Sequence, residues 1–171
     1  MTNQPPQFIV LMGVSGCGKT TVGRRLAQRT GIPYRDGDDF HSEENRAKMA
    51  RSEPLGDADR QPWLQAIVEF SQIECTEGRS LLMACSALKL RYRDQLRSVG
   101  APVKFVHLVG SIELIEVRLS QRSDHFMPKS LLQSQFDILE PPLGEAGVIE
   151  VSIEQEVDEI VDEVVHAFGL C

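Results

Sequence analysis

Short apolar runs recur along the chain and alternate with segments whose apolar residues have helical spacing. The runs cover residues 8–12, 32–34, 80–85, 103–109 and 147–151. The first, FIVLM, contains no polar residue, which is typical of a strand buried on both faces of a parallel sheet. Apolar residues three and four positions apart predict helices from near Asp59 and after Ser111. The alternation predicts a three-layer α/β fold, with a parallel sheet of about five strands flanked by helices.

Length and composition are those of one globular domain covering residues 1–171. Apolar residues make up 42% and charged residues 25% of the chain, and no apolar stretch approaches the length of a membrane span. The first residues, MTNQPPQ, do not have the basic and then apolar pattern of a secretion signal, so we expect a cytoplasmic protein. The cysteines at 17, 75, 85 and 171 show no CxxC spacing and are expected to be free thiols.

The net charge of −7 is concentrated near the C-terminus, where residues 150–163 contain seven acids and no base. The rest of the chain carries 18 acidic and 18 basic residues. Apolar residues at helical spacing run through the same segment, so we expect the acids to form the solvated face of a C-terminal helix. Without a basic surplus, neither a nucleic acid nor a membrane surface is predicted as a partner.

A phosphate-binding loop is predicted directly after the first strand. Gly13-x-x-x-x-Gly18-Lys19-Thr20 matches the P-loop pattern, in which glycines let backbone N–H groups close around phosphate oxygens. Lys19 is expected to reach the β- and γ-phosphates of ATP, and Thr20 to provide a hydroxyl to Mg²⁺. The alternative is a glycine-rich turn without a ligand, but strand, loop and helix follow in the order that the mechanism requires. The predicted nucleotide contacts in the loop are Gly13, Val14, Ser15, Gly16, Cys17, Gly18, Lys19, Thr20 and Thr21.

Two carboxylates follow the second strand in the stretch YRDGDDFH, residues 34–41. Opposite a phosphate site, one carboxylate can hold Mg²⁺ while the other orients an attacking hydroxyl or accepts its proton. We assign Asp36 to the metal and Asp38 to the proton, and count both with Lys19 as catalytic. The competing interpretation is a solvated acidic turn, since Asp and Gly are common turn residues.

Basic residues follow in two further segments. Residues 40–62 form a polar, weakly anchored stretch that contains Arg46 and Lys48 and is predicted to move over the site as the substrate-binding segment. After the strand LLMACS, Lys89 and Arg93 are four residues apart and are expected to share a helix face, with Arg91 pointing away. Such cations suit an anionic acceptor, although a role in solubility remains the alternative.

A lid is predicted over residues 120–132, in the segment RLSQRSDHFMPKS that starts at Arg118. Arg118 and Arg122 are one helical turn apart, and Arg122 is expected to neutralise charge on the transferred phosphoryl group as a further catalytic residue. Ser130 is predicted to cap the helix that follows. The alternative is an exposed helix end whose arginines interact favourably with the helix dipole.

The chain resembles the gluconokinase family of small P-loop kinases over residues 8–142. The segments that carry the resemblance are LMGVSGCGKTTVG, DGDDFHSEENRAKM, PLGDADRQPWL, CSALKLRYRDQLR and HFMPKSLLQSQFDILEPP. The resemblance implies a P-loop kinase fold, a homodimer, and Mg²⁺-dependent transfer of the ATP γ-phosphoryl group to the 6-hydroxyl of D-gluconate. It also implies that Asp38 and His41 contact substrate hydroxyls. The substrate carboxylate would be held by some of Arg46, Lys48, Lys89 and Arg93.

The chain departs from the usual family pattern at two places. Cys17 stands where these kinases often have serine, and RSEP at residues 51–54 replaces the more usual SGxP.

Three other functions fit parts of the sequence. A P-loop kinase for shikimate or another sugar acid is the nearest alternative. A nucleotide-dependent switch would carry a guanine-reading NKxD motif, but the only asparagines are at positions 3 and 45 and neither has that setting. An inactive nucleotide-binding protein is disfavoured by the intact Lys19, Thr20, Asp36 and Asp38.

Overall fold

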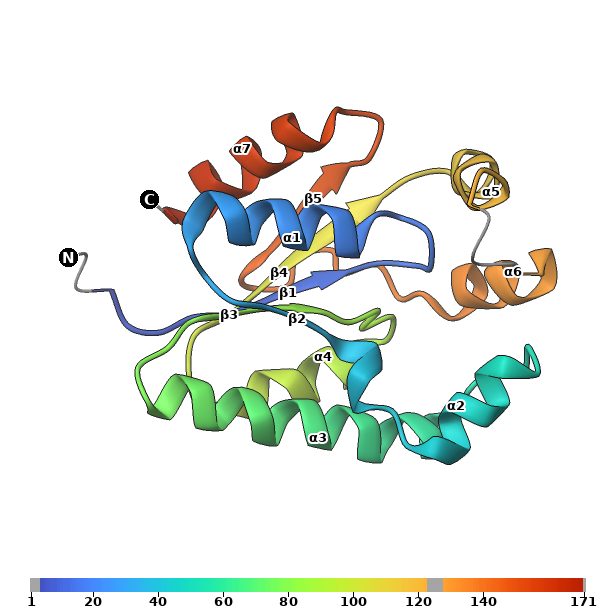
Figure 1. Ribbon diagram of the computed structural model, residues 1–171, viewed down its shortest axis with the longest axis horizontal. Coiled ribbons are helices and arrows are strands. Elements are labelled where there is room, and N and C mark those ends of the chain that lie inside the picture. The colour runs from blue at the N-terminus through green and yellow to red at the C-terminus, as the bar shows by residue number, and fades with distance from the viewer. Residues whose placement is uncertain (1–3, 123–127, 171) are drawn as a thin grey trace.

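The computed structural model describes residues 4–122 and 128–170 and contains a parallel five-stranded sheet with helices on both faces (Figure 1). The strands are β1 (Phe8–Met12), β2 (Tyr34–Asp36), β3 (Leu81–Ala84), β4 (Val103–Val109) and β5 (Val148–Ser152). Their order in the sheet is β2-β3-β1-β4-β5, and every pairing is parallel. The predicted three-layer α/β architecture is therefore confirmed.

Helices connect successive strands and cover the sheet. They are α1 (Lys19–Thr30), α2 (Glu43–Ala50), α3 (Asp57–Thr76), α4 (Leu90–Leu96), α5 (Ile112–Ser120), α6 (Lys129–Ile138) and α7 (Val157–Phe168), with short 3₁₀ helices η1 (Gly37–Phe40) and η2 (Arg97–Val99). In the described part of the chain, none of these helices has the length and apolar character needed to cross a membrane.

Strand β1 lies in the centre of the sheet, and all of its residues are 0% exposed. Because side chains alternate along a strand, Ile9 and Leu11 pack into the cluster formed with α1 and α7, whereas Phe8 and Met12 pack toward α3 and α4. Figure 1 shows the two helical layers on opposite sides of the sheet. The absence of polar residues in FIVLM thus reflects burial on both faces.

The C-terminal helix α7 has the predicted division between an apolar and an acidic face. Its buried residues include Val161 and Val164, while acids line the exposed side. Two of those acids also pair with the neighbouring helix α1: Asp158 Oδ1 lies 2.6 Å from Arg25 Nε, and Asp162 Oδ1 lies 3.7 Å from Arg29 Nη2. The acidic face is therefore solvated and partly balanced by basic residues of α1.

Two helices begin at positions other than those predicted. The helix expected to carry both Lys89 and Arg93 begins only at Leu90, because Ala87 has a left-handed φ of 47° and Lys89 an extended backbone with φ −105° and ψ 149°. Ser130 does not cap α6, so that prediction was wrong. The carbonyl of Pro128 accepts the first bonds of this helix, from the N–H groups of Leu131 and Leu132, which places Ser130 inside its first turn.

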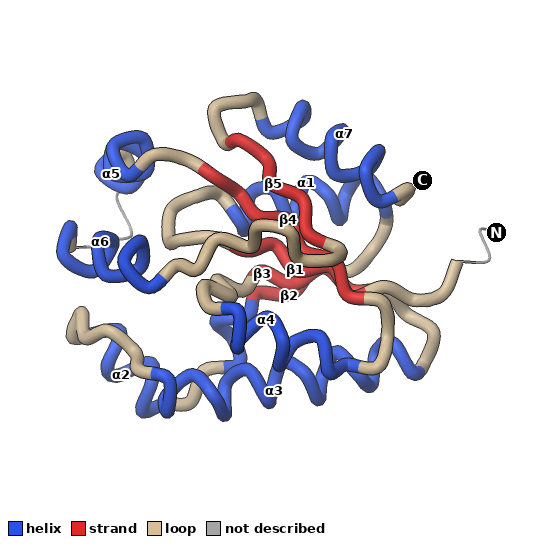
Figure 2. The backbone as a smooth tube through the Cα atoms, turned by 180° about the vertical axis from the view of Figure 1, so that it is seen from behind, coloured by secondary structure: helices blue, strands red, loops and turns tan. Residues whose placement is uncertain are grey.

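The carboxyl ends of the strands meet at one end of the molecule, where α2, α5 and α6 also lie (Figures 1 and 2). The loop after β1 leads to α1, β2 leads into η1, and β3 leads into residues 85–89. Because β3 lies between β1 and β2, the segments after these three strands are neighbours in space. Ligands of open α/β sheets bind at this end of the strands.

Candidate active site

The phosphate loop turns sharply between β1 and α1. Gly18, which precedes α1, has φ +102°, and no atom lies within 4 Å of the position that a Cβ would take there. The backbone conformation, not lack of space, therefore requires glycine. No side chain caps the N-terminus of α1, so its first N–H groups are left for an anionic ligand, as nucleotide phosphates require.

Lys19 folds back over the phosphate loop. Its Nζ donates hydrogen bonds to the carbonyl oxygens of Gly13 and Val14, each at 3.0 Å. Cys17, in the same loop, is only 1% exposed, which fits the interpretation of a small packed residue. The ammonium group is therefore held at the N-terminal half of the loop, at the end where the lysine of this motif reaches the β- and γ-phosphates.

Asp36 and Asp38 have different surroundings. Asp36 is the last residue of β2, and its Oδ1 accepts a hydrogen bond from Asp38 N at 3.0 Å, which caps η1. Burial is the main cause that raises the pKa of Asp36. The hydrogen bond from Asp38 N lowers this pKa, the charges of Asp38 and Asp39 raise it, and the charge of Lys19 lowers it slightly. The Asp38 side chain is 78% exposed and has room to meet a ligand. One carboxylate is thus fixed and the other is accessible, as separate metal and proton roles would require.

Gly37 permits the close packing of this segment against β3. A Cβ at this position would overlap the carbonyl oxygen of Ala84, and the Gly37 carbonyl accepts a hydrogen bond from Trp63 Nε1 at 2.7 Å. The backbone of Gly37 is not left-handed. The need for glycine at position 37 therefore comes from close approach to β3, not from an unusual φ angle.

His41 stacks on the indole of Trp63, next to Asp38. The rings are stacked, with centroids 4.3 Å apart and planes 15° apart. The imidazole Nε2 is 3.9 Å from Asp38 Oδ1, and Nδ1 is 3.4 Å from Asn45 Nδ2. Burial, and then the charges of Arg46 and Arg60, lower the pKa of His41 to about 4. His41 is therefore neutral at physiological pH and can act as a hydrogen-bonding group beside Asp38.

Arg60 is a functional candidate that the sequence interpretation missed. Its Nη1 donates to the Leu55 carbonyl at 2.5 Å, and its guanidinium lies 5.7 Å from the centre of the Tyr92 ring. Burial raises the pKa of Cys85 to about 12, and the charges of Lys19, Asp38 and Arg60 also act on this thiol. Charged groups from three segments thus surround the end of β3. Arg60 lies in PLGDADRQPWL, one of the segments that carry the family resemblance, and this position could have identified it from the sequence.

The basic residues of the substrate-binding segment already have protein partners. Arg46 donates to the carbonyl oxygens of Asp38, Asp39 and His41 at 3.1–3.3 Å. Lys48 Nζ lies 2.9 Å from Asp59 Oδ1. Arg46 therefore holds the backbone of η1 next to α2, and both cations would have to share or exchange partners to bind a substrate carboxylate.

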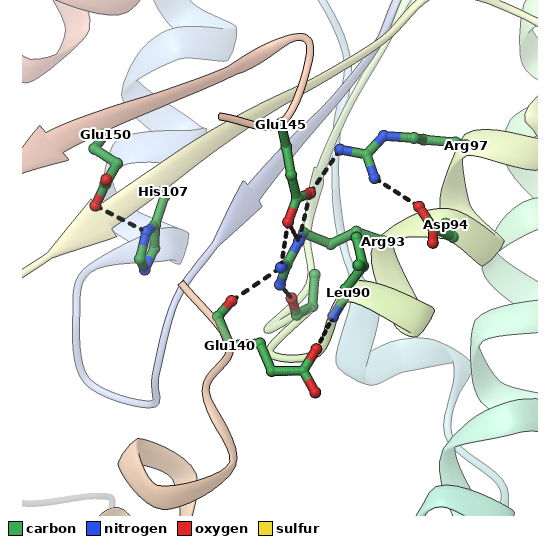
Figure 3. A network of polar contacts seen from close by, with 9 residues as sticks. Leu90, Arg93, Asp94, Arg97, His107, Glu140, Glu145 and Glu150 are labelled. Atoms are coloured by element: carbon green, nitrogen blue, oxygen red, sulfur yellow. Dashed lines mark hydrogen bonds and ion pairs between the residues drawn. The ribbon is translucent and has the colours of Figure 1, made fainter. Parts of the chain in front are cut away.

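The expectation that Lys89 and Arg93 share a face differs from the structure. Lys89 is the extended residue before α4, so it does not follow helical spacing. Its Nζ lies 3.0 Å from Asp57 Oδ1, and Arg91, expected to point away, binds the same carboxylate at 2.9 Å. Arg93 is 0% exposed, and its guanidinium donates to Glu145 and to main-chain carbonyls (Figure 3). Arg93 is therefore a buried structural residue, which corrects its assignment to substrate binding.

The predicted lid arginines lie at the end of α5. Arg118 Nη2 donates to the Ile153 carbonyl, at 2.5 Å, in the segment between β5 and α7. Arg122 is exposed, and its backbone N–H donates to the Leu119 carbonyl at 3.2 Å. Residues 123–127 of the expected lid lie outside the described residues.

A cavity of about 480 Å³ continues from the phosphate loop along α1 to the start of α7. Thr20 and Thr21, in the first turn of α1, line one side, and Glu156 and Val157 line the other. Asp36 and Asp38 do not line it, so the cavity lies beside the phosphate loop and not over the two carboxylates.

Known proteins share both this sequence and this fold. The family profile described as shikimate kinase matches residues 15–168. A probable gluconokinase from Rattus norvegicus is 45% identical over 182 residues, covering 96% of this chain and 98% of the relative. A gluconokinase from Gluconobacter oxydans (strain 621H) is 44% identical over 95% of this chain and 92% of its own. The chain belongs to the gluconokinase family.

A solved structure confirms the P-loop kinase fold for this member of the gluconokinase family. The crystal structure of a gluconokinase from Sinorhizobium meliloti 1021 superposes with a TM-score of 0.88 at 42% identity, covering 98% of this chain and 94% of that chain. The predicted family and fold are thus both confirmed.

The departure from the gluconokinase pattern at residues 51–54 coincides with a strained backbone. Ser52 has φ +57°, a left-handed conformation that costs most residues about 1–2 kcal/mol and glycine very little. Ser52 stands at the glycine position of the more usual SGxP segment. The turn after α2 therefore keeps a conformation suited to glycine although its residue is serine.

Proposed function

We propose that this protein is a gluconokinase that transfers the γ-phosphoryl group of ATP to the 6-hydroxyl of D-gluconate, with Mg²⁺. The main support from the structure is the gathering of Lys19 and Asp38 around the end of β3. Lys19 brings a cation to the phosphate loop, and Asp38 brings an accessible carboxylate from the neighbouring strand end. A phosphate donor and an alcohol acceptor can meet between these groups.

The phosphate loop provides the nucleotide site in this proposal. ATP supplies the phosphoryl group, and Mg²⁺ neutralises charge on its terminal phosphates. Lys19 would exchange its two carbonyl partners for phosphate oxygens, and Thr20 and Asp36 would hold the ion. Among the described residues, no group of three or more His, Cys, Asp or Glu could hold a metal by itself. Arg118 in α5 and Arg122, two residues after its end, would approach the nucleotide.

Asp38 orients the substrate hydroxyl and accepts its proton. Because Asp38 is exposed, its carboxylate is free to reach the substrate hydroxyl. Neutral His41 provides a second hydrogen-bonding group within the same segment. The carboxylate of the sugar acid is proposed to bind among Arg46, Lys48, Lys89 and Arg60. Arg93 is not part of this set because its donors are directed to buried protein acceptors.

The alternative is a related kinase for shikimate or a different sugar acid. A substrate panel separates the two, since a site built to hydrogen-bond one polyol rejects analogues by orders of magnitude. ADP release would be measured with D-gluconate, shikimate, other sugar acids and no acceptor. Gluconate should give the highest kcat/KM, and the Asp38→Asn variant should lose this turnover. A higher kcat/KM with shikimate would replace the proposal by the alternative.

The quaternary state and the compartment are further parts of the proposal. We propose a homodimer, as the resemblance implies, and a cytoplasmic enzyme, supported by the free thiols of Cys75 and Cys85. Light scattering of the purified chain tests the first point. A mass near the 19.1 kDa of one chain would contradict the dimer.

A further inference from the structure

Gln135 connects α6, the helix after the predicted lid, to the phosphate loop. The backbone N–H of Ser15 donates a hydrogen bond to Gln135 Oε1 at 2.7 Å, although the two residues are 120 positions apart in the chain. Leu132, one turn earlier on α6, is 1% exposed and packs in the same core cluster as Val14 and Cys17. The contact is therefore held by the packing of the helix and not only by a long side chain.

The direction of this hydrogen bond fixes the orientation of the Gln135 amide. A backbone N–H can only donate, so the oxygen of the amide faces Ser15 and the NH₂ group must point elsewhere. Among the described residues, Nε2 has no hydrogen-bond acceptor, and the residue is half-buried. Gln133, on the same helix, is exposed and donates from its Nε2 to Asp137 at 2.9 Å. Gln135 thus keeps two donors available beside the loop.

The location of this amide indicates which part of a nucleotide it would meet. Ser15 directly follows Val14, whose carbonyl holds the Lys19 ammonium at 3.0 Å. The lysine of a P-loop reaches the β- and γ-phosphates, so this part of the loop is the end of the terminal phosphates. Thr20 and Thr21, in the first turn of α1, open toward the cavity beside α7. The Gln135 donors therefore lie at the end where the phosphoryl group is transferred.

We propose that Gln135 is a ligand of the transferred phosphoryl group. Ser15 N–H holds Oε1, and Nε2 donates a hydrogen bond to an oxygen of the terminal phosphate. A donor fixed in this way is preorganised and meets a charged acceptor, which makes the bond stronger than one between neutral groups. The same side chain places α6 against the loop when ATP is bound. This inference deepens the proposed function and rests on it for the identity of the reaction.

The test separates the donor of Gln135 from its acceptor. Gln135→Glu keeps an oxygen for Ser15 N–H but loses the donor and adds a negative charge. Gln135→Met removes donor and acceptor without adding charge. Gln133→Glu is the matched control, because it adds the same charge at an exposed position of the same helix. Calorimetry on the full chain would measure Kd for a non-hydrolysable ATP analogue and for ADP, both with Mg²⁺, and thermal unfolding would monitor folding.

Both Gln135 variants should bind the ATP analogue about 10- to 100-fold more weakly, because each loses a hydrogen bond to a charged group. The affinity of both variants for ADP should stay within about threefold of the wild-type value. The control Gln133→Glu should bind both ADP and the ATP analogue within the same threefold range. The proposal is overturned by an unchanged affinity of Gln135→Glu for the ATP analogue, or by equal losses for ADP and the analogue. Wild-type binding by folded Gln135→Met would also overturn it, because the Glu effect would then be charge repulsion alone.

These measurements do not depend on gluconate. If the wild-type chain fails to phosphorylate gluconate, the proposed function fails while the binding test of Gln135 still stands. If Gln135→Met does not fold, the neutral Gln135→Ala takes its place, because Gln135→Glu alone does not separate the loss of the donor from charge repulsion.

Discussion

The guanidinium of Arg93 is completely buried and lies 2.6 Å from Glu145, between Nη2 and Oε1 (Figure 3). It also donates to the carbonyl oxygens of Ala87 and Glu140, at 2.8 Å and 2.9 Å. Arg97 shares the Glu145 carboxylate, and both arginines lower the pKa of this carboxyl group. One buried cation thus joins α4, the loop after β3 and the segment between α6 and β5.

Removing Arg93 should therefore destabilise the fold. Arg93→Met leaves the Glu145 carboxylate and two carbonyls without their main donor, so the free energy of unfolding should fall by about 3–5 kcal/mol. Arg97→Ala is the control: its side chain is 27% exposed, so we expect a loss of about 1 kcal/mol or less. Urea unfolding measures both values. Equal unfolding midpoints for Arg93→Met and wild type would show that the buried pair adds nothing to stability.

Lys19→Ala and Asp38→Asn should impair turnover much more than folding. The Lys19 ammonium bonds to the Gly13 and Val14 carbonyls and the Cys17 thiol of its own loop, and Asp38 is mostly exposed, so neither substitution opens the core. We expect kcat to fall by about 100-fold or more for each variant, because each is proposed to act on the reacting groups. The unfolding free energy should change by less than about 1 kcal/mol. Near-normal kcat at saturating ATP and Mg²⁺ would remove that residue from the mechanism.

Ser52→Gly should stabilise the protein. The left-handed φ of Ser52 costs the folded state about 1–2 kcal/mol, and glycine would remove most of this strain. Glycine also makes the unfolded chain more flexible, which lowers stability by about 0.4–1 kcal/mol. The expected net gain is about 0.5 kcal/mol, measured as a higher urea midpoint. Ser98→Gly in η2, where φ is not positive, should have the opposite sign. Destabilisation by Ser52→Gly would contradict the strain at residue 52.

The buried His41 should make stability depend on pH. Its pKa is lowered to about 4 in the folded protein, mainly by burial, and is about 6.5 when unfolded. As pH falls from about 6.5 to about 4, the unfolded chain takes up a proton that folded His41 does not, so stability is lost, by up to about 3 kcal/mol. His41→Phe keeps a ring against Trp63 without a titrating group. The free energy of unfolding of the wild type, minus that of His41→Phe, should decrease as pH falls from about 6.5 to about 4. A value that does not change with pH would contradict the lowered pKa of His41.

The local pattern of the chain was sufficient for the sheet and the phosphate loop. FIVLM predicted a strand buried on both faces, and the spacing from Gly13 to Thr20 predicted the turn into α1. Asp36 and Asp38 could be placed at a strand end for the same reason, since strand and turn propensities act over a few neighbouring residues.

Contacts between distant segments depended on the tertiary structure. Lys89 and Arg93 have helical spacing, but the left-handed Ala87 delays the helix, so Lys89 pairs with Asp57 while Arg93 is buried against Glu145. Gln135 meets Ser15 only because α6 packs back onto the phosphate loop. Sequence by itself determined which chemical groups stand at the strand ends. Only folding decided which of them stay accessible, because burial and partner choice depend on residues far apart in the chain.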